Sequence, residues 1–179
     1  MNTEDIEFNG VLFILREPNS NGEVVTEGDR EWFYKVINGY RTANRYGHYA
    51  KSFSAYMEHT DLDNKSLAGC RLENIHPEYG NPHCSKTYKD MGDTDKLERF
   101  NEIITEYCPR YVFTCDDIFK AVYESENLSY NDLPDGLFYP NKKTKKQKKM
   151  MIYTHNEKSI NVFEICHPGN GWTIRKDAE

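Results

Sequence analysis

The sequence predicts an α/β fold built around a short, mainly parallel sheet, and two observations point to it. An unbroken apolar run at residues 11–15 lacks the alternation of a half-exposed strand, so we expect a strand buried on both faces, and Tyr-Val-Phe-Thr at 111–114 indicates a second short buried strand. This second strand lies between two segments of helical periodicity, and strands that alternate with helices favour parallel pairing through right-handed crossovers. At 179 residues the chain is long enough for one domain, spanning 1–179, with a sizeable core.

The elements follow from local signals along the chain. Asp29 and Gly39 bracket the first amphipathic helix as N-cap and stop, and Thr94 and Pro109 bracket a longer one in the same way. In the first half of the chain we expect a strand over 11–15, helices over 30–38 and 52–59, a strand over 69–76 and a loop over 78–93. In the second half we expect a helix over 94–108, a strand over 111–114 and a helix over 117–123. The last two strands, over 150–155 and 160–166, are joined by a turn at 156–158.

Composition narrows the class of protein. The net charge of −6 argues against broad electrostatic capture of nucleic acid, although it leaves room for a local basic groove. Every apolar segment falls short of the roughly 20 residues that a membrane-spanning helix needs, and residues 1–9 lack the basic and apolar regions of a signal peptide. Five scattered cysteines without a Cys-x-x-Cys pair are typical of reduced, mostly buried thiols. We therefore expect a cytoplasmic protein without membrane contact.

Glu17 and His167 are the main candidates for chemistry. Each follows a predicted buried strand and precedes a proline, and ligands of open α/β sheets bind beyond the carboxyl ends of the strands. A carboxylate and an imidazole at one edge can orient a water and donate to a leaving group. Both residues also fit ordinary polar positions at a strand exit. Asn74, near another strand end, could read the edge of a base or could cap a loop.

Two further patterns each allow two interpretations. His76, His83 and Cys84 have no spacing of a common zinc site and no evident fourth ligand, so we expect neither a metal nor another cofactor. The lysine-rich loop at 141–149 is either a solvated, mobile segment or an arm that tracks phosphates. Its nucleic-acid-binding candidates are Lys142, Lys143, Lys145, Lys146, Lys148 and Lys149.

Four motifs in this order resemble the uracil-DNA glycosylase superfamily, most closely its single-strand-selective monofunctional uracil glycosylase branch. The first is Leu-Phe-Ile-Leu-Arg-Glu-Pro-Asn at 12–19, at the place of the family's strand and Gly-x-Asp/Asn-Pro. The second is Asn-Ile-His-Pro at 74–77, and the third is the helix, proline, strand and helix at 97–122. The fourth is Ile-Cys-His-Pro-Gly-Asn-Gly-Trp at 165–172, where the family has a strand followed by His-Pro-Ser.

The resemblance implies a three-layer α/β/α sandwich and a base-excision repair hydrolase that acts as a monomer on uracil or another lesion in single- or double-stranded DNA. By position, Glu17 would orient the water that attacks the sugar C1′, and His167 would stabilise the departing base. Asn74 would read the flipped base, and an aromatic residue would stack on it, for which Trp32, Phe33 and Tyr79 are candidates. The same motifs bring further substrate-binding candidates, namely Pro18, Asn19, Pro168, Gly169 and Asn170.

Other readings of the same residues remain open. Glu17 is one methylene longer than the aspartate of the family motif, and Arg16 stands in a turn where the family has glycine. These departures also fit an inactive module on the same fold that binds nucleic acid, a nucleotide or a protein partner. A hydrolase of small glycosides or nucleosides is a third reading, because it also needs a carboxylate at a sugar carbon.

Overall fold

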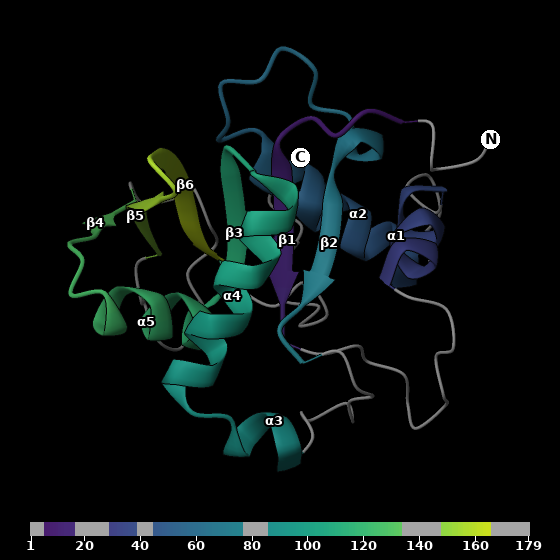
Figure 1. The fold of residues 1–179 in the computed structure, drawn as a ribbon. Coiled ribbons are helices and arrows are strands. Elements are labelled where there is room, and N and C mark those ends of the chain that lie inside the picture. The colour runs from purple at the N-terminus through teal and green to yellow at the C-terminus, as the bar shows by residue number, and fades with distance from the viewer. Residues whose placement is uncertain (1–5, 17–28, 39–44, 77–85, 134–147, 166–179) are drawn as a thin grey trace.

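A computed structural model describes residues 6–16, 29–38, 45–76, 86–133 and 148–165 of the chain. Its centre is a six-stranded sheet with the strand order β2-β1-β3-β6-β5-β4 (Figure 1). The strands are β1 (Val11–Leu15), β2 (Arg71–Asn74), β3 (Tyr111–Cys115), β4 (Asn131–Asp132), β5 (Lys149–His155) and β6 (Lys158–Ile165). The helices are α1 (Asp29–Asn38), α2 (Arg45–Met57), α3 (Lys86–Asp90), α4 (Asp93–Tyr107) and α5 (Asp116–Ser125), with a 3₁₀ turn η2 (Leu67–Gly69).

The pairing confirms the predicted α/β class and the mainly parallel sheet. Strands β2, β1, β3 and β6 run parallel, whereas β5 and β4 are added antiparallel to β6 and to each other. The parallel strands β1 and β3 are buried along their whole length, as predicted from the sequence. The antiparallel β5 alternates between buried and exposed residues, because one of its faces is open to water.

Helices cover both faces of the sheet and complete three layers. Side chains alternate between the faces of a strand, so Phe13 and Leu12 point to opposite sides. Phe13 contacts Phe33 of α1 and Phe53 of α2, with ring centroids 6.3 and 4.3 Å apart. On the opposite face, the Tyr107 hydroxyl of α4 donates to the Glu73 carboxylate of β2. Figure 1 accordingly shows α4 in front of the sheet and α2 behind it.

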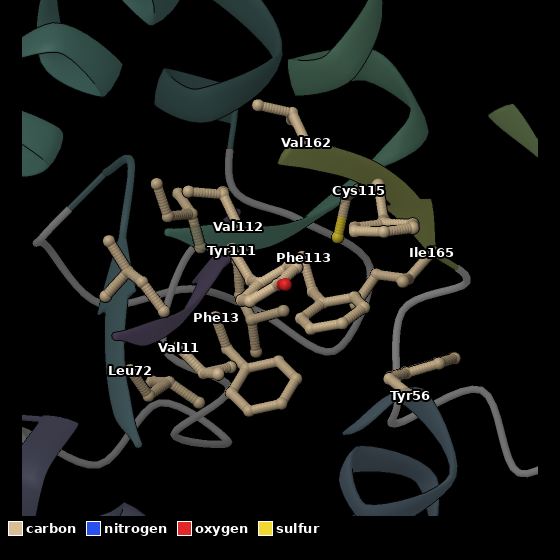
Figure 2. Close-up of a cluster of buried hydrophobic side chains, with 14 of the residues drawn as sticks. Val11, Phe13, Tyr56, Leu72, Tyr111, Val112, Phe113, Cys115, Val162 and Ile165 are labelled. Atoms are coloured by element: carbon tan, nitrogen blue, oxygen red, sulfur yellow. The ribbon is translucent and has the colours of Figure 1, made fainter. Parts of the chain in front are cut away.

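The core is organised by a row of phenylalanine rings across three strands. Register places Phe13, Phe113 and Phe163 side by side on β1, β3 and β6. Their ring centroids are 5.3 Å apart between Phe13 and Phe113, and 5.0 Å apart between Phe113 and Phe163. Tyr56 of α2 stacks on Phe113 from the helical layer (Figure 2). These contacts fix the parallel strands in register, so their carboxyl ends reach the same edge of the sheet.

Several local predictions differ from the structure, and helix α2 begins at Arg45, seven residues before the predicted start at 52. Helix α4 begins at Asp93 with Gly92 as its N-cap rather than Thr94, because the Asp95 carboxylate accepts from the Gly92 backbone N–H. The stretch predicted as a loop at 78–93 contains α3, which is only five residues long and too short for a clear period. The two-residue strand β4 is missing from the prediction for the same reason.

Candidate functional site

The candidate site lies at the carboxyl ends of the four parallel strands. Register puts Leu15 of β1 level with Asn74 of β2, and Cys115 of β3 level with Ile165 of β6. Only β3 separates β1 from β6, so their ends are on the order of 10 Å apart, two inter-strand spacings. Glu17 and His167 follow these ends by two residues each. Both lie outside the described residues, as do Pro18, Asn19, Pro168, Gly169 and Asn170, so the structure brings together the strands that lead to them.

Asn74 is the predicted site residue that the structure describes in full. It is the last residue of β2 and only 3% exposed, and it lies on the face of the sheet that α1 and α2 cover. Its carbonyl oxygen Oδ1 is buried without a hydrogen-bond partner among the described residues. Burying such an acceptor unpaired costs about 1–3 kcal/mol, so a native protein that keeps it needs a reason. A ligand with an N–H group would satisfy it.

The backbone next to Asn74 is tied to the exit of β1. The Ile75 N–H donates to the Leu15 carbonyl at 2.9 Å, and the His76 N–H donates to the Arg16 carbonyl at 2.9 Å. Two backbone hydrogen bonds therefore join the chain just after β2 to the end of β1. This holds the start of the loop that carries Glu17 beside the amide of Asn74.

Arg16 joins the same edge to the first turn of α5. Its Nε donates to Asp117 Oδ1 at 2.7 Å, and its Nη2 donates to Asp116 Oδ1 at 2.6 Å. The hydroxyl of Tyr88 in α3, itself buried, donates to the other oxygen of Asp117. Burial opposes ionisation of Asp117, but the Tyr88 hydroxyl and the Arg16 guanidinium outweigh it and lower the pKa of that carboxyl below its ordinary value.

The cluster of Arg16, Asp116, Asp117 and Tyr88 is not among the sites predicted from the sequence. Asp116 and Asp117 both lie in the first turn of α5, whose N-cap is Cys115. The signal that could have found it is a cation directly after one parallel strand and two acids directly after its neighbour. Such residues come together when the strands pair, even though a hundred positions separate them in sequence.

The described cysteines and acids do not form a metal or redox site. Burial raises the pKa of the Cys115 thiol to about 12, and burial likewise raises that of Cys70 to about 12, so both thiols stay protonated and unreactive. Among the residues that the structure covers, no group of three His, Cys, Asp or Glu side chains could hold a metal ion. His83 and Cys84, two members of the rejected zinc pattern, lie outside that part of the chain.

Two lysines of the lysine-rich loop are committed to internal contacts. Lys148 Nζ lies 3.2 Å from Glu164 Oε1, and the side chains are only 8% and 2% exposed. Lys149 Nζ lies 3.7 Å from the ring centroid of Tyr130 and 5.5 Å from that of Tyr123. Lys142, Lys143, Lys145 and Lys146 lie outside the described residues. An arm that tracks phosphates would therefore draw on these four lysines rather than on all six.

One of the candidates for base stacking is a core residue instead. Phe33 is buried and packs between Phe13 and Phe53 inside the layer of α1 and α2. A ring enclosed in this way has no face left for a nucleobase. Of Trp32 only the backbone is described, and Tyr79 lies in an undescribed segment.

Comparisons with known proteins leave the site to be interpreted from its own geometry. A scan against protein-family models finds no match, and a search among curated proteins finds no relative. Over the described segments, no helix has the length and apolar character needed to cross a membrane.

The edge combines three kinds of chemical group. The Asn74 carbonyl can accept a hydrogen bond in a water-poor setting, where such a bond is stronger than in water. The Arg16 cluster fixes the backbone at the end of β1. A carboxylate and an imidazole follow in the sequence, and this pair can orient water on one side of a bond and donate a proton on the other.

Proposed function

We propose that this chain is a divergent DNA glycosylase that hydrolyses the N-glycosidic bond of uracil or a related deaminated base in DNA. The observation that carries the proposal is the buried Oδ1 of Asn74, which has no hydrogen-bond partner among the described residues, at the edge where β1 and β6 end. An acceptor in that position favours a base that offers a ring N–H. The resemblance of the four motifs to uracil-DNA glycosylases supports the same assignment.

The chemistry of deamination explains why an amide oxygen would select such bases. The ring nitrogen N3 of cytosine is an acceptor, and deamination to uracil turns it into an N–H donor. The same change occurs at N1 when adenine becomes hypoxanthine. An acceptor that meets another acceptor stays unpaired, which costs about 1–3 kcal/mol and lowers affinity for the undamaged base by one to two orders of magnitude.

Hydrolysis then assigns roles to the two residues after the strands. The base must first leave the helical stack to reach an enclosed edge. The Glu17 carboxylate orients a water toward C1′ of the sugar, and the bond between C1′ and the base nitrogen breaks as the water oxygen bonds to C1′. Glu17 takes the proton that the water loses, and the base, which leaves with the bonding electron pair, is protonated from solvent. His167 donates a hydrogen bond to a carbonyl oxygen of the base and stabilises its developing negative charge. The products are the free base and an abasic sugar.

Strand cleavage at abasic sites tests the proposal. The protein is incubated with single- and double-stranded oligonucleotides that carry uracil, hypoxanthine or xanthine, and alkali then breaks the abasic sites. Matched cytosine and adenine oligonucleotides serve as substrate controls. We expect breaks only at deaminated bases, and a loss of about 10²–10⁴-fold in rate for Glu17→Gln and His167→Ala.

Two outcomes would redirect the assignment. DNA binding without breaks would favour an inactive binding module, which is the main alternative because Leu15, Arg16 and Glu17 depart from the family's first motif. Release of base from free nucleosides but not from DNA would favour a small-substrate hydrolase. Either result would refute a DNA glycosylase.

A further inference from the structure

We propose that Arg16 is a positioning residue of the candidate site, whose guanidinium anchors the end of β1 and thereby sets the backbone from which Glu17 follows. This inference rests on the proposed glycosylase function. It concerns a residue that the resemblance does not supply, because Arg16 stands at the unspecified position x of the family's Gly-x-Asp/Asn-Pro.

Arg16 is fixed at both its backbone and its side chain. Its carbonyl accepts from the His76 N–H at 2.9 Å, which ties it to the extension of β2. Its guanidinium uses two different nitrogens on two carboxylates of α5, at 2.7 Å to Asp117 and 2.6 Å to Asp116. A residue held from two sides in this way transmits little motion to the peptide bond that follows it.

The cluster has a second layer that holds its partners. The Tyr88 hydroxyl of α3 donates to Asp117, so the carboxylate that binds Arg16 is itself oriented. Tyr88 is buried, and the Lys96 ammonium of α4 lies 5.5 Å from the centroid of its ring. A chain of contacts therefore links the Arg16 side chain through Asp117 of α5 to Tyr88 of α3 and Lys96 of α4.

This arrangement argues for positioning rather than for substrate binding. Two carboxylates offset the single positive charge of Arg16, which leaves it a poor partner for a DNA phosphate. Geometry is the sensitive quantity, since misplacing a reacting group by about 1 Å costs about 100-fold in rate.

The chain contains a matched control at the opposite edge of the same sheet. Arg110 precedes β3, and its Nη2 lies 3.0 Å from Asp61 Oδ1. The hydroxyl of Tyr111 donates to that carboxylate as well, so arginine, aspartate and tyrosine recur in the same combination. This second cluster lies at the amino ends of the parallel strands, away from Arg16 and Asn74.

The test compares Arg16→Lys with Arg110→Lys in the full chain on a uracil-containing single-stranded oligonucleotide. Lysine keeps the charge but cannot span both carboxylates with two nitrogens. We expect kcat to fall about 10–100-fold for Arg16→Lys with KM changed less than about threefold, and both parameters to stay within about twofold for Arg110→Lys. Asp117→Asn should lower kcat similarly, and the double variant should lose little more, because both act through one contact.

Several results would overturn the inference. Equal losses for Arg16→Lys and Arg110→Lys would indicate a general structural role. A rise in KM at constant kcat would indicate contact with the substrate, and additive losses in the double variant would separate Arg16 from Asp117. If the wild-type protein itself excises no base, the result refutes the proposed glycosylase function and, with it, the role of Arg16. If the wild-type protein is active but Arg16→Lys does not lower kcat, only the role of Arg16 is refuted.

Discussion

At the scale of single residues, two buried polar side chains of the sheet differ in whether their hydrogen-bonding groups have partners among the described residues. Thr114 of β3 donates its hydroxyl to the Ile14 carbonyl at 2.9 Å and is fully paired for its position in the core. Asn74 of β2 keeps an acceptor unpaired at almost the same depth. A satisfied group stabilises the fold, whereas an unsatisfied one lowers stability and keeps a bonding site open for a ligand.

This contrast predicts opposite effects of two shape-conserving substitutions. Asn74→Leu removes the unpaired oxygen, so we expect the free energy of unfolding to rise by about 1 kcal/mol while uracil excision falls at least 100-fold. Thr114→Val breaks a made hydrogen bond, so we expect unfolding free energy to fall by about 1 kcal/mol with excision nearly unchanged. Urea unfolding and the oligonucleotide assay measure both quantities. A less stable Asn74→Leu protein would show that Oδ1 has a structural partner.

At the scale of elements, the lysine-rich segment shows how a charge pattern can mislead. A run of lysines predicts solvated side chains, yet Lys148 enters the core beside Glu164 at the start of β5. Its carbonyl also accepts from the Leu133 N–H at 2.8 Å, next to the end of β4. Side chain and backbone together therefore anchor the start of the hairpin formed by β5 and β6.

We expect the free energy of unfolding to fall strongly when one partner of the buried Lys148–Glu164 pair is removed, and to change little when both partners are replaced by apolar residues. Lys148→Met leaves the Glu164 charge buried without its cation and should lower the free energy of unfolding by about 3–5 kcal/mol. The double variant Lys148→Met with Glu164→Leu should recover most of that loss, because two apolar side chains need no pairing. Arg99→Ala, which removes an exposed pair with Glu102, is the control and should change stability by less than about 1 kcal/mol. Equal losses in the single and double variants would contradict this account.

The sequence predicts elements well where the pattern is local and less well where it depends on partners. The apolar run at 11–15 identifies β1 as a strand buried on both faces, whereas Met150 to Tyr153 are also all apolar although Ile152 of β5 is 57% exposed, so its one-sided burial is not visible in the sequence. The cluster around Arg16 is not predictable in this way, because Asp116 lies 100 positions away and meets it only through β1–β3 pairing. Asn74 could be chosen as a candidate from its place near a strand end, but its unpaired oxygen is a property of the packed core.

At the scale of the whole molecule, the stability of the fold at acid pH depends on the Arg16 cluster at the carboxyl ends of the parallel strands. The pKa of Asp117 is lowered on folding from its ordinary value of 3.8, by the Tyr88 hydroxyl and the Arg16 guanidinium acting against burial. A carboxyl with a lowered pKa contributes stability that is fully present above its unfolded pKa. That contribution is lost as the pH falls through the lower, folded value.

The sign of this shift makes a measurable prediction. The difference in unfolding free energy between wild type and Asp117→Asn should be constant above about pH 5 and should shrink as the pH falls below the ordinary value of 3.8. Urea unfolding at intervals from neutral to acidic pH measures it. A difference that stays constant into strong acid would mean that the Asp117 carboxylate gains nothing from its neighbours.

The order of the strands also has a consequence for synthesis on the ribosome. Strand β3 lies between β1 and β6, but β6 leaves the ribosome last among the described strands. Until it arrives, the nascent chain carries one ring of the phenylalanine row, Phe113, without its neighbour Phe163, and a parallel strand with an open hydrogen-bonding edge. An incomplete chain that stops before residue 158 would therefore expose an apolar surface and an unpaired strand edge that chaperones or other nascent chains can bind.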